Sequence, residues 1–287
     1  MPTKQQPLSA SQAGIHTLVT AGAPINYRDS WRIFKVMAEI VEGYQFLGQF
    51  KNEVTVLGSA RIPANNKYYK IAEELGQLLG KNGFSTITGG GPGIMEAANK
   101  GAYEVGGESE GLNIQLPMEQ RTNPYVKHSI AFHYFFTRKI MLTSPANSFV
   151  YFPGGFGTLD EFFEVLDHMD LGHMDKAPIA LVGKEFWEPI MQFLMSKSSD
   201  EIHSISASHI AGCKIVETAE EAFDLIKKGG ERPNICNSDP ENPLCIEGTN
   251  WKLFRIMAEL VEGFEFLTKI KENITILGTR SILPGSE

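Results

Sequence analysis

The stretch FPGGFGTLDEFFEV (residues 152–165) places a glycine-rich loop directly before two acids. The three glycines of such a loop free its backbone N–H groups, and Thr158 can donate its hydroxyl to an anion or cap the helix that follows. This half of the stretch suits a phosphate. Asp160 and Glu161 are expected in the first turn of that helix, where they either complement the helix dipole or serve a group other than phosphate, because like charges repel.

A second glycine-rich stretch, TGGGPGIMEAAN (residues 88–99), has the same architecture. A predicted strand ends in three consecutive glycines and turns into a helix near Pro92 or Gly93, which brings unhindered N–H groups and a helix N-terminus together. The spacing matches neither G-x-x-x-x-G-K-[ST] nor G-x-G-x-x-G, which argues against ATP and NAD. Alternatively, the glycines only permit a tight strand-to-helix turn.

Two adjacent cations, Arg138 and Lys139, stand on an otherwise aromatic predicted helix, FHYFFTRKIM. Because they precede the 152–165 loop, they could reach both a phosphate and a sugar, although an arginine on such a surface is more often exposed or paired. Arg61, in GSAR, and Glu119, in LPMEQR, follow other predicted strands. For Glu119 the default interpretation is a solvated loop acid.

Histidine and cysteine residues form no reactive pattern. His168 and His173 have a five-residue spacing that is poor for one helix face, so no metal site is expected. There is no serine nucleophile elbow and no Cys/His arrangement. The cysteines Cys213, Cys236 and Cys245 are too few and too unpatterned for a disulfide framework or a zinc site, which favours a reducing cytoplasm.

Composition argues against two classes of partner. The chain of 287 residues has a formal net charge of -8, so it lacks the basic footprint expected of a nucleic-acid-binding protein. No apolar run approaches the roughly 20 residues that a membrane span needs. We therefore expect neither nucleic acid nor a membrane as a partner.

The elements that must position these residues alternate from residue 53 onward, with short β-branched runs between helix-length amphipathic segments. This pattern is typical of an α/β fold with a doubly wound parallel sheet and helices on both faces. The expected strands are 54–58, 84–89, 110–116, 148–152 and 178–183, and the expected helices are 68–81, 93–105, 132–142, 158–169, 185–195 and 218–230. Because the carboxyl ends of parallel strands meet at one edge, Gly58, residues 89–93 and residues 153–158 should be neighbours in one crevice.

An internal repeat adds an N-terminal helix and a C-terminal helix–strand copy of it. Residues 31–58 recur at residues 251–278, with 14 of 28 positions identical. The second copy has no glycine loops, so we interpret it as a packing or oligomerisation element; alternatively, it covers or regulates the crevice of its own or a neighbouring subunit. The chain thus divides into a polar arm (1–30), an α/β domain (31–230) and an extension (231–287).

Together these motifs resemble the LONELY GUY (LOG) family, whose signature is P-G-G-x-G-T-x-x-E preceded by an Arg-Lys pair. Here the signature is PGGFGTLDE after RKIM, and GGGPGIMEAAN and GLNIQLPMEQ complete a pattern similar to longer bacterial members. The resemblance covers about residues 31–228. It implies a Rossmann-like fold and a cytokinin riboside 5′-monophosphate phosphoribohydrolase activity, which hydrolyses the N-glycosidic bond of a nucleoside monophosphate to ribose 5-phosphate and adenine or an N6-substituted adenine. Members are often labelled lysine decarboxylase-like, but nothing here supports a pyridoxal phosphate site, and no cofactor is expected.

The resemblance also implies roles for individual residues. Glu161 and Arg138 are the implied catalytic pair: Glu161 orients the ribose hydroxyls and water and stabilises an oxocarbenium-like cation, while Arg138 orients the substrate and assists the leaving base. The implied substrate-binding residues are Ser59, Gly89, Gly90, Gly91, Glu119, Lys139, Gly154, Gly155, Phe156, Gly157, Thr158, Leu159 and Asp160.

The family builds its site at a dimer interface, which implies at least a homodimer. The aromatic helix around residues 132–136 is expected either at that interface or in plain core packing. Asp167 stands near a position where members commonly carry Thr, so the preferred base stays open. The alternative function is a non-catalytic nucleotide or molybdenum-cofactor carrier on the same fold, against which the intact Arg138 and Glu161 argue.

Overall fold

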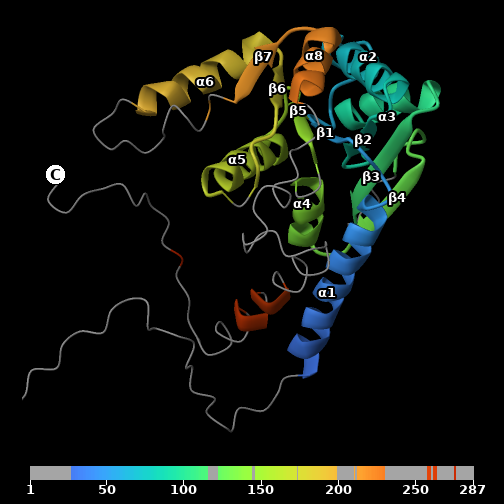
Figure 1. The fold of residues 1–287 in the computed structure, drawn as a ribbon, viewed down its shortest axis with the longest axis vertical. Helices are drawn as coiled ribbons and strands as arrows, with labels where there is room; N and C mark the ends of the chain where they lie inside the picture. The colour runs from blue at the N-terminus through green and yellow to red at the C-terminus, as the bar shows by residue number, and fades with distance from the viewer. Residues whose placement is uncertain are drawn as a thin grey trace, which may run out of the picture.

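A computed structural model describes residues 27–115, 122–143, 146–172, 174–198, 210, 212–229, 257–259, 261–263 and 275 of the chain. Within these residues, the strands form one parallel sheet of seven, in the order β4-β3-β2-β1-β5-β6-β7 (Figure 1). The strands are β1 (Glu53–Leu57), β2 (Ser85–Thr88), β3 (Glu108–Ile114), β4 (His128–Phe132), β5 (Ser148–Tyr151), β6 (Ile179–Val182) and β7 (Cys213–Val216). The helices are α1 (Tyr27–Leu47), α2 (Lys67–Lys81), α3 (Ile94–Glu104), α4 (Phe135–Thr143), α5 (Phe156–Asp170), α6 (Lys184–Ser198) and α8 (Ala219–Gly229).

The doubly wound α/β fold predicted from the sequence is confirmed. The five predicted strands are present, and β4 and β7 are two strands that the sequence pattern did not predict. Both lie at the edges of the sheet and bury few side chains: Phe132 is the buried residue of β4, and Val216 that of β7. Because exposed edge strands need no continuous apolar run, the sequence gives no signal for β4. The helix predicted at 132–142 begins instead at Phe135, and Phe132 is the last residue of β4.

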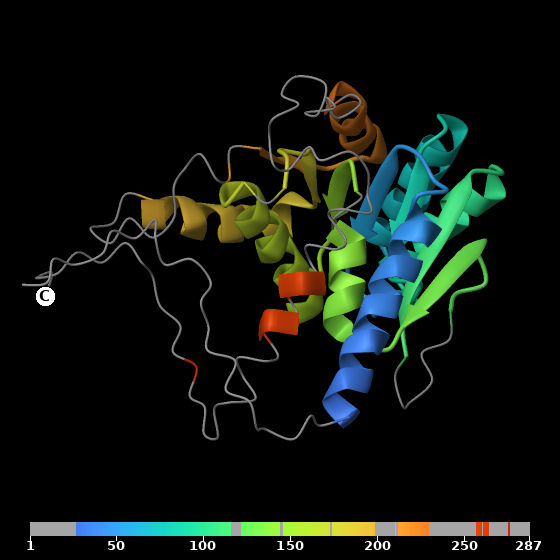
Figure 2. The ribbon, with the colours of Figure 1, turned by 60° about the horizontal axis from the view of Figure 1, so that its bottom comes forward.

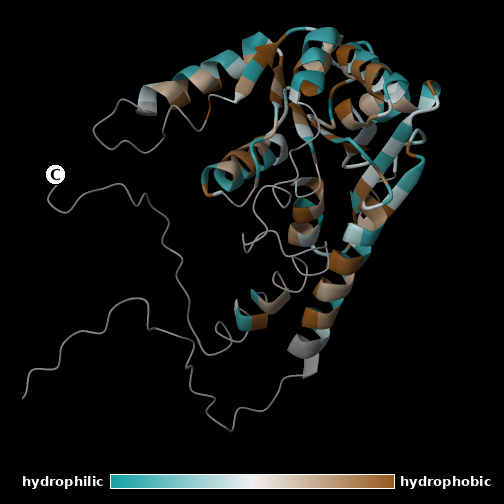
Figure 3. Cartoon of the chain, in the orientation of Figure 1, coloured by the Kyte–Doolittle hydropathy of each residue, from teal (hydrophilic) through white to brown (hydrophobic). Residues whose placement is uncertain are grey.

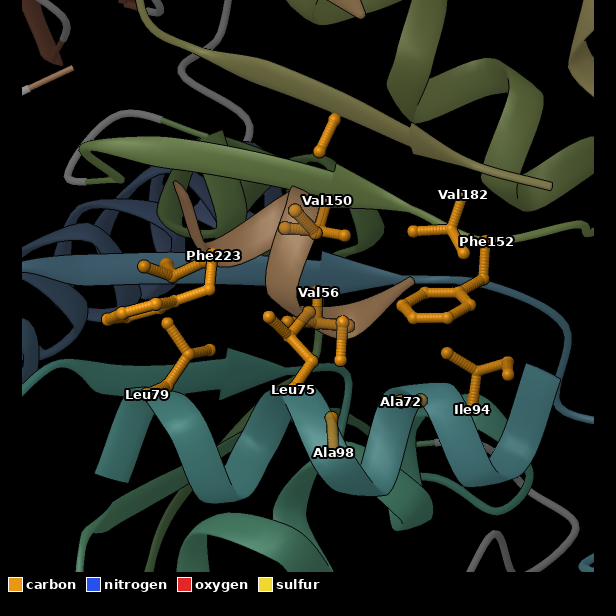
Figure 4. Close-up of a cluster of buried hydrophobic side chains, with 14 of the residues drawn as sticks. Val56, Ala72, Leu75, Leu79, Ile94, Ala98, Val150, Phe152, Val182 and Phe223 are labelled. Carbon is orange, nitrogen blue, oxygen red and sulfur yellow. The ribbon is translucent and has the colours of Figure 1, made fainter. Parts of the chain in front are cut away.

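Helices α2, α3 and α8 cover one face of the sheet. Figure 4 shows Leu75 of α2 pointing at Val56 of β1, while Leu79 meets Phe223 of α8. All four side chains are buried. Burial of this kind contributes about 1.5–3 kcal/mol per large apolar side chain, so this cluster anchors the strands whose ends carry the loops described below.

The close approach of α2 and α3 depends on two glycines. A Cβ on Gly76 of α2 would collide with the Ala98 carbonyl oxygen, and one on Gly101 of α3 would collide with the Glu73 carbonyl oxygen. Since both obstacles are backbone atoms, neither can move aside cheaply. The two helices therefore cross backbone against backbone, which fixes the direction in which α3 leaves the β2 loop.

The other face is covered by α5 and α6 over β5 and β6, and by α1 and α4 over β2, β3 and β4. Trp187 of α6 is fully buried and packs on Phe162 of α5, with ring centroids 5.0 Å apart. Hydrophobic and hydrophilic residues alternate along α1 and α6, as expected of helices with one covered side (Figure 3). In Figure 2, α4 lies between α1 and α5 on this face, so the helix with the two cations has a neighbour on each side.

The second copy of the repeat lies mostly outside the described residues. Residues 257–259 and 261–263 are helical, and Met257 is buried against a cluster that includes Val36 and Ile40 of α1. Met257 is the counterpart of Met37, which packs on the same cluster. This contact favours the packing role predicted for the extension, while the division of the chain near residues 30 and 230 stays a prediction. In the described part of the chain, no helix is long and apolar enough to cross a membrane.

A buried acid on β3 predicts an unusual dependence of stability on pH. Glu110 is 0% exposed, and neither carboxyl oxygen has a hydrogen-bond partner among the described residues. Burial, with a smaller effect of Glu108, raises the pKa of Glu110 from 4.5 to about 8, and Lys127 opposes this. The folded protein therefore binds this proton more tightly than the unfolded chain, so stability falls as the pH rises from about 4.5 through about 8.

Glu110→Gln removes this titration. We expect the variant to gain about 2–4 kcal/mol of unfolding free energy relative to wild type between pH 5 and pH 9, because each unit of pKa shift corresponds to about 1.4 kcal/mol. Urea unfolding at the two pH values measures the difference. Glu108→Gln, an exposed acid on the same strand, is the control and should show a much smaller pH-dependent change. A Glu110→Gln effect of equal size at both pH values would contradict the assignment.

Candidate active site

The loops after β1 and β5 meet where the strand order reverses, at the carboxyl ends of these two strands. Ser59, just after β1, ties three loops together: its N–H donates to Pro153 O at 3.1 Å, and its carbonyl accepts from Ile94 N at 3.2 Å. A Cβ on Gly58 would collide with the side chains of Ile94 and Phe152. The predicted meeting of the loops after β1, β2 and β5 is confirmed.

The loop after β5 presents an open helix N-terminus. Helix α5 begins at Phe156, two residues earlier than predicted, and Gly155 at its N-cap position makes no side-chain capping bond. The first intrahelical bond at this end is donated by Leu159 N to Gly155 O at 3.1 Å. The N–H groups of Phe156, Gly157 and Thr158 therefore face outward at the positive end of the helix, as an anion site requires.

The earlier start of α5 corrects the expected place of the two acids. The first turn of α5 holds no acid, so Asp160 and Glu161 lie in the second turn rather than the first. Because the dipole effect falls off within the first turn, Asp160 is not explained as a dipole partner. The anion-binding end and the carboxylates are thus separated along the helix.

Side chains of the loop differ in exposure. Thr158 is buried, and its hydroxyl lies against Gly154, where a Cβ would collide with Thr158 Oγ1. Gly155 and Gly157 are exposed, and a Cβ on either would meet nothing within 4 Å. Phe156 is 93% exposed, which leaves a large apolar ring in solvent at the start of α5.

The loop after β2 is held by a network of buried amides. Gly90 has a φ of +70°, its N–H donates to Thr88 Oγ1 at 2.9 Å, and its carbonyl accepts from Asn123 N at 2.9 Å. The Asn123 amide also donates to Gly91 O at 3.1 Å and to Asn99 Oδ1 at 3.0 Å. Because the polar groups of Gly90 are already engaged, this glycine shapes the loop, and Asn99 and Asn123 are supports that sequence reasoning missed.

Arg138, from the first turns of α4, reaches over this loop. Its Nε donates to Leu112 O at 2.6 Å and its Nη2 to Gly89 O at 3.4 Å. A Cβ on Gly89 would collide with Nη2, so the glycine makes room for the guanidinium. Burial lowers the pKa of Arg138, and the nearby charge of Glu161 opposes that change.

Glu161 is the buried acid of the site. Its residue exposure is 6%, and Tyr151 Oη donates to its backbone carbonyl at 3.1 Å, which fixes this turn of α5 to β5. Burial raises the pKa of the Glu161 carboxyl to about 7, against the opposing charges of Arg138 and Lys139. A carboxyl with a pKa near neutral can exchange a proton at physiological pH.

Lys139 joins α4 to α5 through two acids. Its Nζ lies 2.8 Å from Asp160 Oδ2 and 2.8 Å from Glu164 Oε2. Burial lowers the pKa of Lys139, but the hydrogen bonds from the two carboxylates outweigh it and raise the pKa overall. Glu164 was not predicted; its place one helical turn beyond Glu161 was the available signal.

The remaining predicted residues lie beside these loops or outside the residues that the structure describes. The Ser59 hydroxyl accepts from Arg61 N at 3.1 Å, and Arg61 itself is exposed. Leu159 is half-buried against the α5–α6 cluster. Glu119 lies outside the described residues, as does His173. Among the residues that are described, no group of three or more His, Cys, Asp or Glu side chains is placed to hold a metal ion.

Comparisons with known proteins point to one family. The family model described as "possible lysine decarboxylase" matches residues 95–226. A cytokinin riboside 5′-monophosphate phosphoribohydrolase of Rhodococcoides fascians is 27% identical over 177 residues, covering 59% of this chain and 88% of that protein. A protein of the same name from Arabidopsis thaliana is 29% identical over 185 residues, covering 63% of this chain and 83% of its own length.

Among solved structures, the molybdenum cofactor carrier protein of Chlamydomonas reinhardtii is 23% identical, with a TM-score of 0.48. The match covers 62% of this chain and 98% of that one. At this level of similarity, the likeness says nothing about the ligand of the present chain.

Proposed function

We propose, from the premise that the chain belongs to the LONELY GUY (LOG) family, that it hydrolyses the N-glycosidic bond of purine nucleoside 5′-monophosphates. The products are ribose 5-phosphate and a free base, adenine or an N6-substituted adenine. The observation that carries this proposal is the buried Glu161 carboxyl, with a pKa near 7, in the second turn of a helix whose N-terminus is uncapped.

The N-terminus of α5 is the proposed phosphate subsite. The three outward N–H groups of Phe156, Gly157 and Thr158 match the three peripheral oxygens of a phosphate monoester, and no acid lies in this turn to repel it. Gly154 and Gly155 keep side chains away from the bound anion, and Ser59 with Gly89 and Gly91 forms the neighbouring wall of the crevice.

Glu161 then meets the sugar. Glu161 lies five positions after Phe156, which corresponds to roughly 7.5 Å along the helix at about 1.5 Å per residue, close to the length of a ribose 5-phosphate. Cleavage of the bond from C1′ to the base leaves positive charge on the sugar, and a carboxylate at that place stabilises it. Asp160 and Glu161 therefore lie beyond the phosphate subsite, at the level of the ribose, where a negative charge stabilises the sugar cation.

The reaction balances with water as the only co-substrate. The pair of electrons of the glycosidic bond leaves with the base, water oxygen bonds to C1′, and one water proton passes to the Glu161 carboxylate. Glu161 then releases this proton, which protonates the base nitrogen, so that the carboxylate is restored. A carboxyl with a pKa near 7 can accept and release that proton at neutral pH. Arg138 stays charged and stabilises the negative charge that develops on the leaving base.

Lys139 and Asp160 are proposed to hold helices α4 and α5 together beside the substrate. Lys139 links α4 to α5 by pairing with Asp160 and Glu164, and Asp160, whose side chain is 54% exposed, is the member of this group that can turn toward a substrate. Leu159 supports this turn from the core side. Glu119 stays a predicted substrate contact.

The oligomer and the compartment are also proposals. Phe135 and Phe136 of α4 and Phe163 of α5 are 51%, 37% and 42% exposed, and aromatic side chains left exposed on adjacent helices suit an interface with a second copy, as a homodimer would provide. Among the described residues, Cys213 carries a free thiol, which fits a reducing cytoplasm.

The first test is a comparison of AMP with adenosine. We expect AMP or N6-isopentenyl-AMP to give free base and ribose 5-phosphate, and adenosine to react with a kcat/KM lower by at least about 100-fold, because phosphate binding holds the sugar against Glu161. Chromatography of the products measures both rates. Inosine and cytidine monophosphates in the same panel report the base preference. Binding of nucleotides without turnover of any would overturn the proposal in favour of a carrier.

A further inference from the structure

Helix α4, which carries Arg138 and Lys139, begins without a capping residue of its own. The residues before it, His133 and Tyr134, lack the short polar side chains that usually accept from the first N–H groups of a helix. With nine residues, α4 is also too short to be stable by itself. Its position must therefore be set by groups from elsewhere in the fold.

Glu39 of α1 supplies the missing acceptor from almost one hundred residues away in the chain. Its Oε1 accepts from His133 N at 2.7 Å, and its Oε2 accepts from Tyr134 N at 3.2 Å and from Thr137 Oγ1 at 2.6 Å. Thr137 Oγ1 also lies 2.7 Å from Tyr134 O. One carboxylate thus holds three donors at the start of α4, and its negative charge faces the positive end of the helix.

Arg138 follows Thr137 directly, so the residue that carries the guanidinium lies in the same helical turn as the groups that Glu39 holds. The Arg138 backbone N–H donates to Tyr134 O at 3.4 Å, inside the capped segment. At the other end of the side chain, Nε is held 2.6 Å from Leu112 O. With both ends fixed, a small rotation or shift of α4 would pull the guanidinium off the Gly89 loop and away from Glu161.

We propose that Glu39 is a positioning residue for the reaction: it sets the start of α4 so that Arg138 lies over Gly89 and beside Glu161. This inference rests on the proposed function and adds a residue that touches no substrate. It also assigns a task to α1, whose sequence is the one repeated near the end of the chain.

The test compares Glu39→Ala and Glu39→Gln with Glu42→Ala, an exposed acid one turn further along α1. We expect Glu39→Ala to lower kcat for AMP by about 10-fold or more with little change in KM, Glu39→Gln to fall between it and wild type because one acceptor oxygen remains, and Glu42→Ala to match wild type.

The second readout is the titration of Glu161, followed by NMR of isotope-labelled glutamate. The charged groups that face Glu161 are Arg138 and Lys139 from α4 and Asp160 and Glu164 from α5. Displacing the cations of α4 should move the Glu161 midpoint to higher pH in Glu39→Ala. This measurement needs no turnover, so it tests Glu39 even if wild type releases no base, an outcome that would refute only the proposed function. A Glu39→Ala protein that melts earlier but keeps both kcat and the Glu161 midpoint would overturn the inference. If Glu39→Ala fails to fold, Glu39→Gln carries the same two measurements.

Discussion

Glu161→Gln is expected to lower kcat/KM for AMP by about 1,000-fold. The amide keeps the size of the side chain but cannot become a negative charge opposite the sugar cation, nor can it accept the proton of water. Release of free base under single-turnover conditions measures the loss. A variant that still releases base at more than about a tenth of the wild-type rate would contradict the role of Glu161.

The pH profile separates this role from general damage. Because the ionised carboxylate is the active form and its pKa is about 7, wild-type kcat/KM should rise between pH 6 and pH 8 and then level off. The residual activity of Glu161→Gln should lack this limb. A limb of the same midpoint in the variant would assign the titration to another group.

Stability provides the control for folding. The pKa of Glu161 is raised in the folded state, so its ionisation costs stability as the pH rises from about 4.5 through about 7. Glu161→Gln should therefore melt at a higher temperature than wild type at pH 8, and the difference should shrink at pH 5. Loss of activity together with a gain in stability cannot be attributed to unfolding.

Gly89→Ala is expected to lower kcat/KM by about 100-fold. The new Cβ would occupy the place of Arg138 Nη2, and the guanidinium, as the far end of a long side chain, would move rather than the backbone. The matched control is Gly212→Ala, where a Cβ meets nothing within 4 Å. Steady-state kinetics with AMP measures both variants, and thermal melting should show Gly89→Ala folded.

A double-mutant cycle decides whether Gly89 acts through Arg138. If it does, adding Gly89→Ala to Arg138→Ala should cost little beyond Arg138→Ala alone, since the displaced group is already gone. Fully additive losses would show that Gly89 serves the site by another route, such as direct contact with the substrate.

The central part of the fold was predictable because its signals are local. The strands β1, β2, β5 and β6 are short, apolar or β-branched and almost wholly buried. Glycine follows β1, β2 and β6 directly, and Pro153 follows β5 after one residue. The edge strands β4 and β7 carry no such signal, because exposed residues on one or both faces leave their composition unconstrained. The sequence predicts that α5 begins two residues later than it does, because glycine has a low helix propensity and Gly157 therefore indicates a loop.

The residues of the site divide in the same way, into those with a local sequence signal and those without one. Arg138, Glu161 and the two glycine loops belong to contiguous motifs, and the parallel topology alone brings those motifs together. Glu39 and Asn123 could not be predicted to serve the site, since each acts on residues far away in the chain through hydrogen bonds that leave no spacing pattern. Supports of this kind become visible only once the chain is folded.

The central position of β1 limits what can be cut from this protein and moved into another. The segment matched by the family model, residues 95–226, contains Arg138 and Glu161 but excludes β1 and β2. In the sheet, β1 lies between β2 and β5, and β2 lies between β1 and β3. Excising the matched segment would therefore remove the middle of the sheet and leave β3 and β5 each without one of its two neighbouring strands. A transplantable module has to start at α1, so that the reactive side chains travel with the strands and the capping acid that keep them in place.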